Sequence, residues 1–288
     1  MSRSFLFVPA DSEHKMRKAG DSGADALILD LEDSVAANAR PEARGLAAEY
    51  LTGKDNVWVR INPIDTEDAV ADLAAVMPSS PAGIVLPKPQ SAADVVRLSE
   101  LLDGLESRHG ITAGQTRIIA LCTERPDALF TLASYDAATP RLVALTWGAE
   151  DLAAAVGASS NRDDAGNWLP PYELARSLCL FAAAAAKVAA VDTVFTDYQD
   201  SAGLAHYAAN ARRDGFSGML AIHPAQIDVI NNAFMPTLAE LDRAERIVAL
   251  FDDNPDAGAL GMDGAMIDRP HFVQAQRLLL LAKKLAAQ

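Results

Sequence analysis

The chain has few cysteines and no long hydrophobic run, and each shortage excludes a class of protein. Neither of its two cysteines, Cys122 and Cys179, has a spacing that suits a metal or redox site, so we expect both to be buried apolar residues of a reduced protein. The apolar run at the N-terminus is too short for a secretory signal. The longest apolar stretch, Leu178–Val191, is too short and too rich in alanine to cross a bilayer. We therefore predict a cytoplasmic protein with no membrane contact.

Basic residues are also scarce. There are 25 Lys and Arg against 39 Asp and Glu, for a formal net charge of -14. This excess repels phosphates, so we predict no nucleic-acid partner. An anionic substrate would need a locally basic pocket, and one basic cluster, containing Lys15, Arg17 and Lys18, follows the first expected strand. The cluster is either a phosphate-binding surface or a solvated helix face.

Short apolar runs alternate with longer helical patterns along the 288 residues. Most of these runs are continuously apolar, which is typical of parallel strands buried on both faces. Eight strands separated by helices predict a (β/α)₈ TIM barrel over residues 1–224, with an open doubly wound sheet as the competing fold. No Gly-x-Gly-x-x-Gly follows a strand, which weakens that competitor. The expected strands are Ser4–Val8, Ala26–Leu29, Val57–Ile61, Gly83–Leu86, Arg117–Cys122, Leu142–Trp147, Val191–Phe195 and Gly218–Ile222.

Helical patterns fill the intervals and the tail of the chain. Between the strands we expect helices such as Asp94–Ser107, Pro126–Ser134 and Tyr172–Ala190. Residues 225–288 form a C-terminal helical extension that is longer than a barrel needs. It should contain a helix at Thr237–Phe251, a loose loop from Asp252 to Ala265 and a last helix from about Pro270 to Ala287. The extension either covers the barrel or reaches a neighbouring subunit.

Polar or charged residues follow nearly every expected strand. In a barrel the carboxyl ends of all strands converge on one mouth, which is where barrel active sites lie. Clustered carboxylates repel one another unless a cation is present, and oxygen ligands without Cys or clustered His favour Mg²⁺ or Mn²⁺. Arg60 lies inside an apolar strand, so it must be paired or meet a ligand. The strand-end residues are Asp30, Glu32, Asp33, Arg60, Lys88, Glu124, Glu150, Asp151, Asp197, Asp200 and His223.

Seven segments together resemble the citrate lyase β-subunit-like group, which includes malyl-CoA and citramalyl-CoA lyases of the HpcH/HpaI aldolase/citrate lyase superfamily. The most specific is Ala-Asp-Ala-Leu-Ile-Leu-Asp-Leu-Glu-Asp-Ser-Val, starting at Ala24. The others, in chain order, are Arg-Ser-Phe-Leu-Phe-Val-Pro, Val-Arg-Ile-Asn, Val-Leu-Pro-Lys, Trp-Gly-Ala-Glu-Asp-Leu-Ala, Gly-Phe-Ser-Gly-Met-Leu-Ala-Ile-His-Pro-Ala-Gln-Ile and Asp-Gly-Ala-Met-Ile-Asp-Arg-Pro. Each motif is weak by itself, but the ordered set is specific and spans nearly the whole chain.

The resemblance implies a Mg²⁺-dependent carbon–carbon lyase. Its substrate would be a β-hydroxyacyl thioester such as malyl-, citramalyl- or citryl-CoA, and its products an acyl-CoA and an α-keto acid. The tail would complete the active site of a neighbouring subunit in a homotrimer or homohexamer. The implied roles are Arg60 for the substrate carboxylate, Glu124 and Asp151 for Mg²⁺, Asp30, Glu32 and Asp33 for metal-bound water, Asp268 as general acid/base, and Lys15, Arg17 and Lys18 for coenzyme A or an acyl carrier.

One departure from the family pattern concerns the substrate. The family has Glu-Thr-Ala after the fifth strand, whereas this chain has Thr123-Glu124-Arg125. Arg125 would then pair with Glu124 or bind a second substrate carboxylate.

Three alternatives to the lyase remain open from the sequence. The same site would suit hydrolysis of a malyl-CoA-like thioester. The chain would also suit a citrate lyase β-like subunit that acts only with partners. A sugar-phosphate aldolase would use a Schiff-base lysine, for which Lys88 is the candidate.

Overall fold

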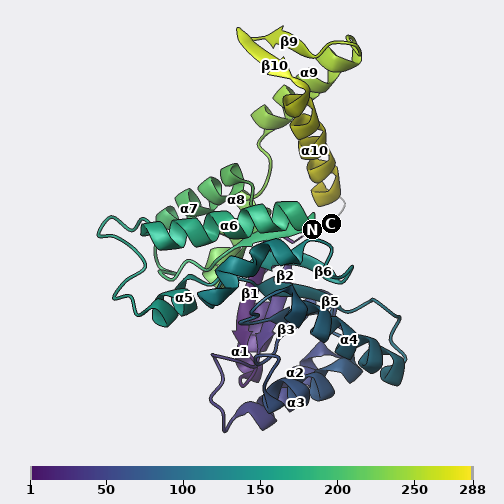
Figure 1. Cartoon of the computed structure of the whole chain (residues 1–288), viewed down its shortest axis with the longest axis vertical. Helices are drawn as coiled ribbons and strands as arrows, with labels where there is room; N and C mark the ends of the chain where they lie inside the picture. The colour runs from purple at the N-terminus through teal and green to yellow at the C-terminus, as the bar shows by residue number, and fades with distance from the viewer. Residues whose placement is uncertain (1, 287–288) are drawn as a thin grey trace. The chain divides into compact units, whose positions relative to one another are not determined.

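The structure is a computed structural model that describes residues 2–286. Eight parallel strands close into a barrel in chain order, and β8 pairs with β1, which confirms the predicted fold (Figure 1). Their bounds lie close to the predicted ones, except in the seventh strand. The strands are β1 (Ser4–Pro9), β2 (Ala26–Asp30), β3 (Val57–Arg60), β4 (Gly83–Leu86), β5 (Arg117–Leu121), β6 (Leu142–Thr146), β7 (Ala189–Asp192) and β8 (Gly218–Ala221).

The barrel interior explains the continuously apolar strands. All residues of β2, β4 and β8 are buried, because the interior covers one face of each strand and helices cover the other. Ile28, Trp58 and Val85 belong to the cluster that fills the interior. Gly83 makes room for this filling, since a Cβ atom there would lie 2.3 Å from the Trp58 ring.

Helices follow the strands and end on recognisable signals. In α4 the Ser91 hydroxyl caps the N-terminus, Val95 and Leu98 face inward, and Gly110 ends the helix in a left-handed conformation. The helices of the barrel unit are α1 (Glu13–Gly20), α2 (Arg40–Leu51), α3 (Glu67–Val76), α4 (Ala92–His109), α5 (Ala149–Val156), α6 (Pro170–Ala186), α7 (Ser201–Asp214) and α8 (Ile227–Ala233), with 3-10 helices η1 (Met77–Ser79), η2 (Asp127–Tyr135) and η3 (Pro224–Gln226).

The structure corrects two boundaries around α6 and β7. The helix predicted at Tyr172–Ala190 ends at Ala186, because Lys187 adopts a positive φ of 59° and caps it. The strand predicted at Val191–Phe195 therefore starts earlier, at Ala189, where it pairs with β6. Alanine favours helices over strands, so the predicted helix was extended wrongly into Ala189 and Ala190 of β7. The helix predicted at Pro126–Ser134 is the 3-10 helix η2.

The barrel unit extends beyond residue 224 to Ala233. Helix α8 continues the packing, since Ile227 and Ile230 are buried and the Asn231 side chain accepts a hydrogen bond of 2.8 Å from Ser4. Both cysteines are free and buried, as predicted. Within residues 2–286 no helix is long and apolar enough to cross a membrane.

The second unit begins at Phe234 and contains α9 (Leu238–Asp252), β9 (Ala259–Met262), β10 (Ala265–Asp268) and α10 (Arg269–Ala286). The prediction of a loose loop from Asp252 to Ala265 is wrong, because β9 and β10 form an antiparallel hairpin. Asp263 and Gly264 turn the hairpin with positive φ values of 53° and 78°, a conformation that Asp-Gly favours. Phe251 of α9 and Ile267 of β10 share the unit's small core.

Candidate active site

Charged side chains gather at the carboxyl ends of neighbouring barrel strands. Asp30 ends β2 and lies opposite Arg60, which ends β3, in the strand register. Lys88 follows β4, Glu124 follows β5, and Asp151 lies in the first turn of α5 after β6. The barrel thus brings together the residues that the sequence separates, as the strand-end pattern predicted.

Arg60 is held by two carboxylates and an aromatic ring. Its Nε and Nη2 atoms each donate a 2.7 Å hydrogen bond to Asp30, and Nη1 lies 3.1 Å from Glu32 Oε2. The guanidinium also lies 4.7 Å from the centre of the Phe7 ring. Burial would raise the pKa of Asp30, but the charge and hydrogen bonds of Arg60 lower it, so the pair stays ionised. Of the two possibilities left open for Arg60, the ion pair is therefore present.

Lys88 is the second cation of the cluster and touches three acids. Its Nζ lies 2.5 Å from Glu32 Oε1, 3.0 Å from Asp33 Oδ2 and 3.3 Å from Asp151 Oδ1. Burial raises the pKa of Glu32 to about 7, even though the charges of Arg60 and Lys88 lower it. The same acids raise the pKa of Lys88 despite its burial. The lysine is therefore a stable ammonium ion.

Glu124 is a buried acid of the cluster, and one of its two carboxylate oxygens has no partner in the described chain. Its Oε2 accepts a 2.5 Å hydrogen bond from the backbone N–H of Lys88, whereas its Oε1 is buried without a hydrogen-bond partner in the described chain. Burial, followed by the charges of Asp151 and Glu32, raises the pKa of Glu124 well above its usual value. Gly148 packs against it so closely that a Cβ atom would lie 2.6 Å from Glu124 Cγ.

These observations fit a hard divalent cation held by oxygen atoms. A cation would satisfy Glu124 Oε1 and offset the repulsion from Asp151. Among residues 2–286, however, no group of three or more His, Cys, Asp or Glu side chains is arranged to hold a metal. The protein side chains would therefore supply part of the coordination shell, as is usual for Mg²⁺, which keeps waters and substrate oxygens as ligands.

The other predicted barrel residues lie outside this cluster. Arg125 is exposed and pairs with Asp127 through bonds of 3.1 and 2.9 Å, so the predicted alternative of an Arg125–Glu124 pair is not formed. Lys15, Arg17 and Lys18 are exposed on α1, as a phosphate-binding surface or a solvated face would be.

Asp268 ends β10 in the C-terminal unit, where its carboxylate contacts His271 Nδ1. This contact links the Asp268 side chain, at the end of β10, to the first turn of α10. The proton-transfer role predicted for Asp268 stays a prediction.

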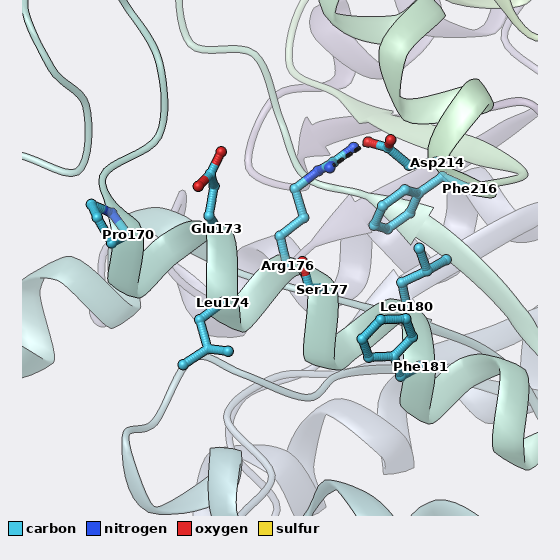
Figure 2. Close-up of a pocket in the computed structure, with 9 residues that line it drawn as sticks. All are labelled: Pro170, Glu173, Leu174, Arg176, Ser177, Leu180, Phe181, Asp214 and Phe216. Atoms are coloured by element: carbon cyan, nitrogen blue, oxygen red, sulfur yellow. Dashed lines mark hydrogen bonds and ion pairs between the residues drawn. The ribbon is translucent and has the colours of Figure 1, made fainter.

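A separate pocket of about 680 Å³ lies along α6 and is lined by Arg176, Asp214 and Phe216, among others. Figure 2 shows Arg176 pointing toward Asp214, to which its Nη1 donates a 2.7 Å hydrogen bond. Its Nε and Nη2 bond the buried Asp192 at 3.0 and 2.8 Å. Because Arg176 is already paired on both sides, this pocket is a weaker candidate than the barrel mouth.

Sequence reasoning missed two residues that shape the cluster. Gly148 lies within a segment that resembles the family, but nothing in the chain's pattern ties it to Glu124. Phe7, in β1, supports Arg60 from a distant part of the chain. Neither contact has a local sequence signal.

Two curated proteins are similar to this chain over nearly its whole length. Citrate lyase subunit beta of Leuconostoc mesenteroides subsp. cremoris is 32% identical over 288 residues, covering 98% of this chain and 93% of that protein. A (3S)-malyl-CoA thioesterase of Cereibacter sphaeroides is 32% identical over 291 residues, covering 99% of this chain and 96% of the relative.

Solved structures give the same result. CitE from Mycobacterium tuberculosis, in complex with magnesium, acetoacetate and coenzyme A, has a TM-score of 0.83 and 33% identity, with 98% of both chains covered. A citrate lyase beta subunit from the same organism, complexed with oxaloacetate and magnesium, has a TM-score of 0.72 and 35% identity, covering 82% of this chain and 97% of that one. The family model for HpcH/HpaI aldolase/citrate lyase matches residues 3–224. As the sequence motifs predicted, this chain belongs to the HpcH/HpaI aldolase/citrate lyase family.

Proposed function

We propose that this chain is a carbon–carbon lyase that cleaves, or in reverse forms, a β-hydroxyacyl thioester such as malyl-, citramalyl- or citryl-CoA. The products would be an acyl-CoA and an α-keto acid. The observation that carries the proposal is the buried Glu124 Oε1, which has no hydrogen-bond partner among residues 2–286 and lies in a cluster that also contains Arg60. Solved relatives that hold magnesium with acetoacetate and coenzyme A, or with oxaloacetate, support this substrate class.

Glu124 and Asp151 would hold Mg²⁺, or Mn²⁺ in its place. When bound, such an ion acts as a Lewis acid that lowers the proton affinity of a substrate hydroxyl. Asp30, Glu32 and Asp33 belong to the same cluster through Arg60 and Lys88, and they would accept hydrogen bonds from metal-bound water. A cation beside Glu124 would also offset the repulsion that Asp151 and Glu32 exert on it.

Arg60 would bind the carboxylate of the substrate. Asp30 accepts hydrogen bonds from Nε and Nη2 of Arg60, which fixes the plane of the guanidinium. The guanidinium has five N–H donors in all, so others remain for a ligand. A planar fork of donors matches a carboxylate in charge and geometry. Arg125, at the exposed edge, would bind a second carboxylate only after leaving Asp127.

Asp268 would move the proton on the acyl carbon. Its carboxylate contacts His271 Nδ1, which would help to orient it. We expect it to serve the barrel of a neighbouring copy in a homotrimer or homohexamer. Lys15, Arg17 and Lys18 would meet the phosphates of coenzyme A or of an acyl carrier, since they supply positive charge in an acidic protein.

A thioesterase is the second candidate, because one full-length relative is a (3S)-malyl-CoA thioesterase. A product screen separates the two reactions. The protein is incubated with Mg²⁺ and malyl-, citramalyl- and citryl-CoA, and both α-keto acid and free thiol are measured. Keto acid with acyl-CoA supports the lyase, whereas free thiol with the intact hydroxy acid supports hydrolysis. Thioester binding without any turnover would favour a subunit that needs partners.

Two substitutions test the assigned roles. Glu124→Ala should abolish cleavage and metal binding, and Asp268→Asn should abolish cleavage while metal binding persists. Asp253→Asn, an exposed aspartate of the C-terminal unit, serves as the control and should leave both unchanged. Full activity in Glu124→Ala or Asp268→Asn would refute that residue's role.

The Schiff-base alternative is disfavoured by the surroundings of Lys88. Its carboxylate neighbours raise the pKa of the ammonium, whereas a nucleophilic lysine needs a lowered pKa. Borohydride trapping with substrate should therefore give no adduct.

A further inference from the structure

Lys88 contacts both proposed metal ligands by different parts of one residue. Its backbone N–H donates to Glu124 Oε2 at 2.5 Å, and its Nζ lies 3.3 Å from Asp151 Oδ1. A residue that touches both ligands is placed to influence any ion between them.

The backbone at Lys88 is unusual. Its φ is 50°, although it is not glycine and stands between Pro87 and Pro89. Non-glycine residues with positive φ are uncommon, and a residue before proline normally prefers an extended conformation. Such a conformation persists where the surrounding structure enforces it, often at functional sites. Here it directs the N–H toward Glu124 while the side chain reaches across the mouth.

The ammonium and a metal ion would compete for the same carboxylate. Mg²⁺ would bind a carboxylate oxygen of Asp151 at about 2.1 Å, beside the ammonium nitrogen that lies 3.3 Å from Asp151 Oδ1. Two cations this close repel strongly in a partly buried site. A lysine stem is flexible, so Nζ could leave Asp151 and keep its contacts with Glu32, at 2.5 Å, and Asp33, at 3.0 Å.

We propose that Lys88 is a positioning residue that acts as the resident counter-ion of the acidic mouth: its ammonium neutralises Asp151 before metal binds and must withdraw when metal arrives. The inference rests on the proposed metal site of Glu124 and Asp151. It implies that Lys88 weakens the intrinsic affinity for a divalent ion while its backbone N–H orients Glu124. Removing only the ammonium should therefore tighten metal binding.

The test measures Mn²⁺ binding to the full-length protein by electron paramagnetic resonance and calorimetry, without substrate. Lys88→Met keeps most of the aliphatic stem and should bind Mn²⁺ at least about tenfold more tightly, which corresponds to about 1.4 kcal/mol. Lys88→Arg keeps the charge and should stay close to the wild type. Lys54→Met is the matched control, because Lys54 lies over the Tyr50 ring and not in the acidic cluster; it should leave Mn²⁺ affinity unchanged.

Thermal melting gives a second readout. Without metal, Lys88→Met should melt at a lower temperature than the wild type, because its acids have lost their counter-ion. Mn²⁺ should raise its melting temperature by more than it raises that of the wild type. If Lys88→Met does not fold, Lys88→Gly removes the same charge at a position where glycine tolerates the positive φ, and the same increase in affinity is expected.

The outcomes separate this inference from the proposed function. Equal or weaker Mn²⁺ binding in the folded Lys88 variants would overturn the counter-ion role and leave the metal site intact. Wild-type protein that binds no Mn²⁺, or binds it equally after Glu124→Ala, would overturn the metal site and the counter-ion role together.

Discussion

Gly148→Ala is the substitution whose effect the structure predicts most directly. The added Cβ would lie 2.6 Å from Glu124 Cγ, whereas ordinary contacts begin near 3.4 Å. One of the two groups must therefore move by about 0.8 Å. The backbone itself does not resist alanine, because Gly148 has an extended φ of -116° that any residue adopts. The strain thus falls on the carboxylate proposed to bind metal.

The size of the effect follows from this displacement. A misplacement of about 1 Å at a reacting centre costs about a hundredfold in rate, and overpacking a buried site costs about 1–3 kcal/mol of stability. We expect Gly148→Ala to weaken Mn²⁺ binding at least about tenfold and to slow thioester cleavage by a comparable or larger factor.

The assay pairs Mn²⁺ titration with thermal melting and a glycine control. Gly104→Ala lies in α4 with nothing within 4 Å of the new Cβ, so metal binding should not change. The helix should gain up to about 1 kcal/mol from the better helix former. A folded Gly148→Ala protein that binds Mn²⁺ as tightly as the wild type would show that Glu124 is not a ligand or that its position does not matter.

Two further predictions concern buried ion pairs. Asp30→Asn should lower the free energy of unfolding by about 3–5 kcal/mol in urea titrations, because it leaves the buried Arg60 without its bidentate partner; a loss below about 1 kcal/mol would contradict this. Glu106, whose pKa is lowered to about 2 by Arg141 and two backbone N–H groups despite burial, should contribute up to about 3 kcal/mol. A carboxylate whose pKa is lowered by folding stabilises the protein at pH values above its pKa in the unfolded chain. The stability difference between wild type and Glu106→Gln should therefore shrink as the pH falls from about 4.5 toward about 2. A difference independent of pH would refute the assignment.

Most of the barrel could be predicted because its signals are local. Continuously apolar runs identified seven of the eight strands closely, since a strand buried on both faces must be apolar throughout. The seventh was shifted because β7 begins with Ala189 and Ala190, and alanine favours a helix unless tertiary contacts override it. The Asp263-Gly264 pair is a hairpin signal. The hairpin was not predicted because the strands on either side of the pair are short and only weakly apolar.

The site was partly predictable for a related reason. Strand ends converge in a barrel, so the order of strands along the chain is enough to place Asp30, Arg60, Glu124 and Asp151 at one mouth. The sequence by itself thus placed these four charges at one mouth, but it did not separate them from other strand-end residues such as Glu150, which accepts a hydrogen bond from Asn161. Only the tertiary structure decided how they pair, because the choice of Asp30 for Arg60, of Lys88 for Asp151 and of Gly148 beneath Glu124 depends on distances between strands that no local pattern records.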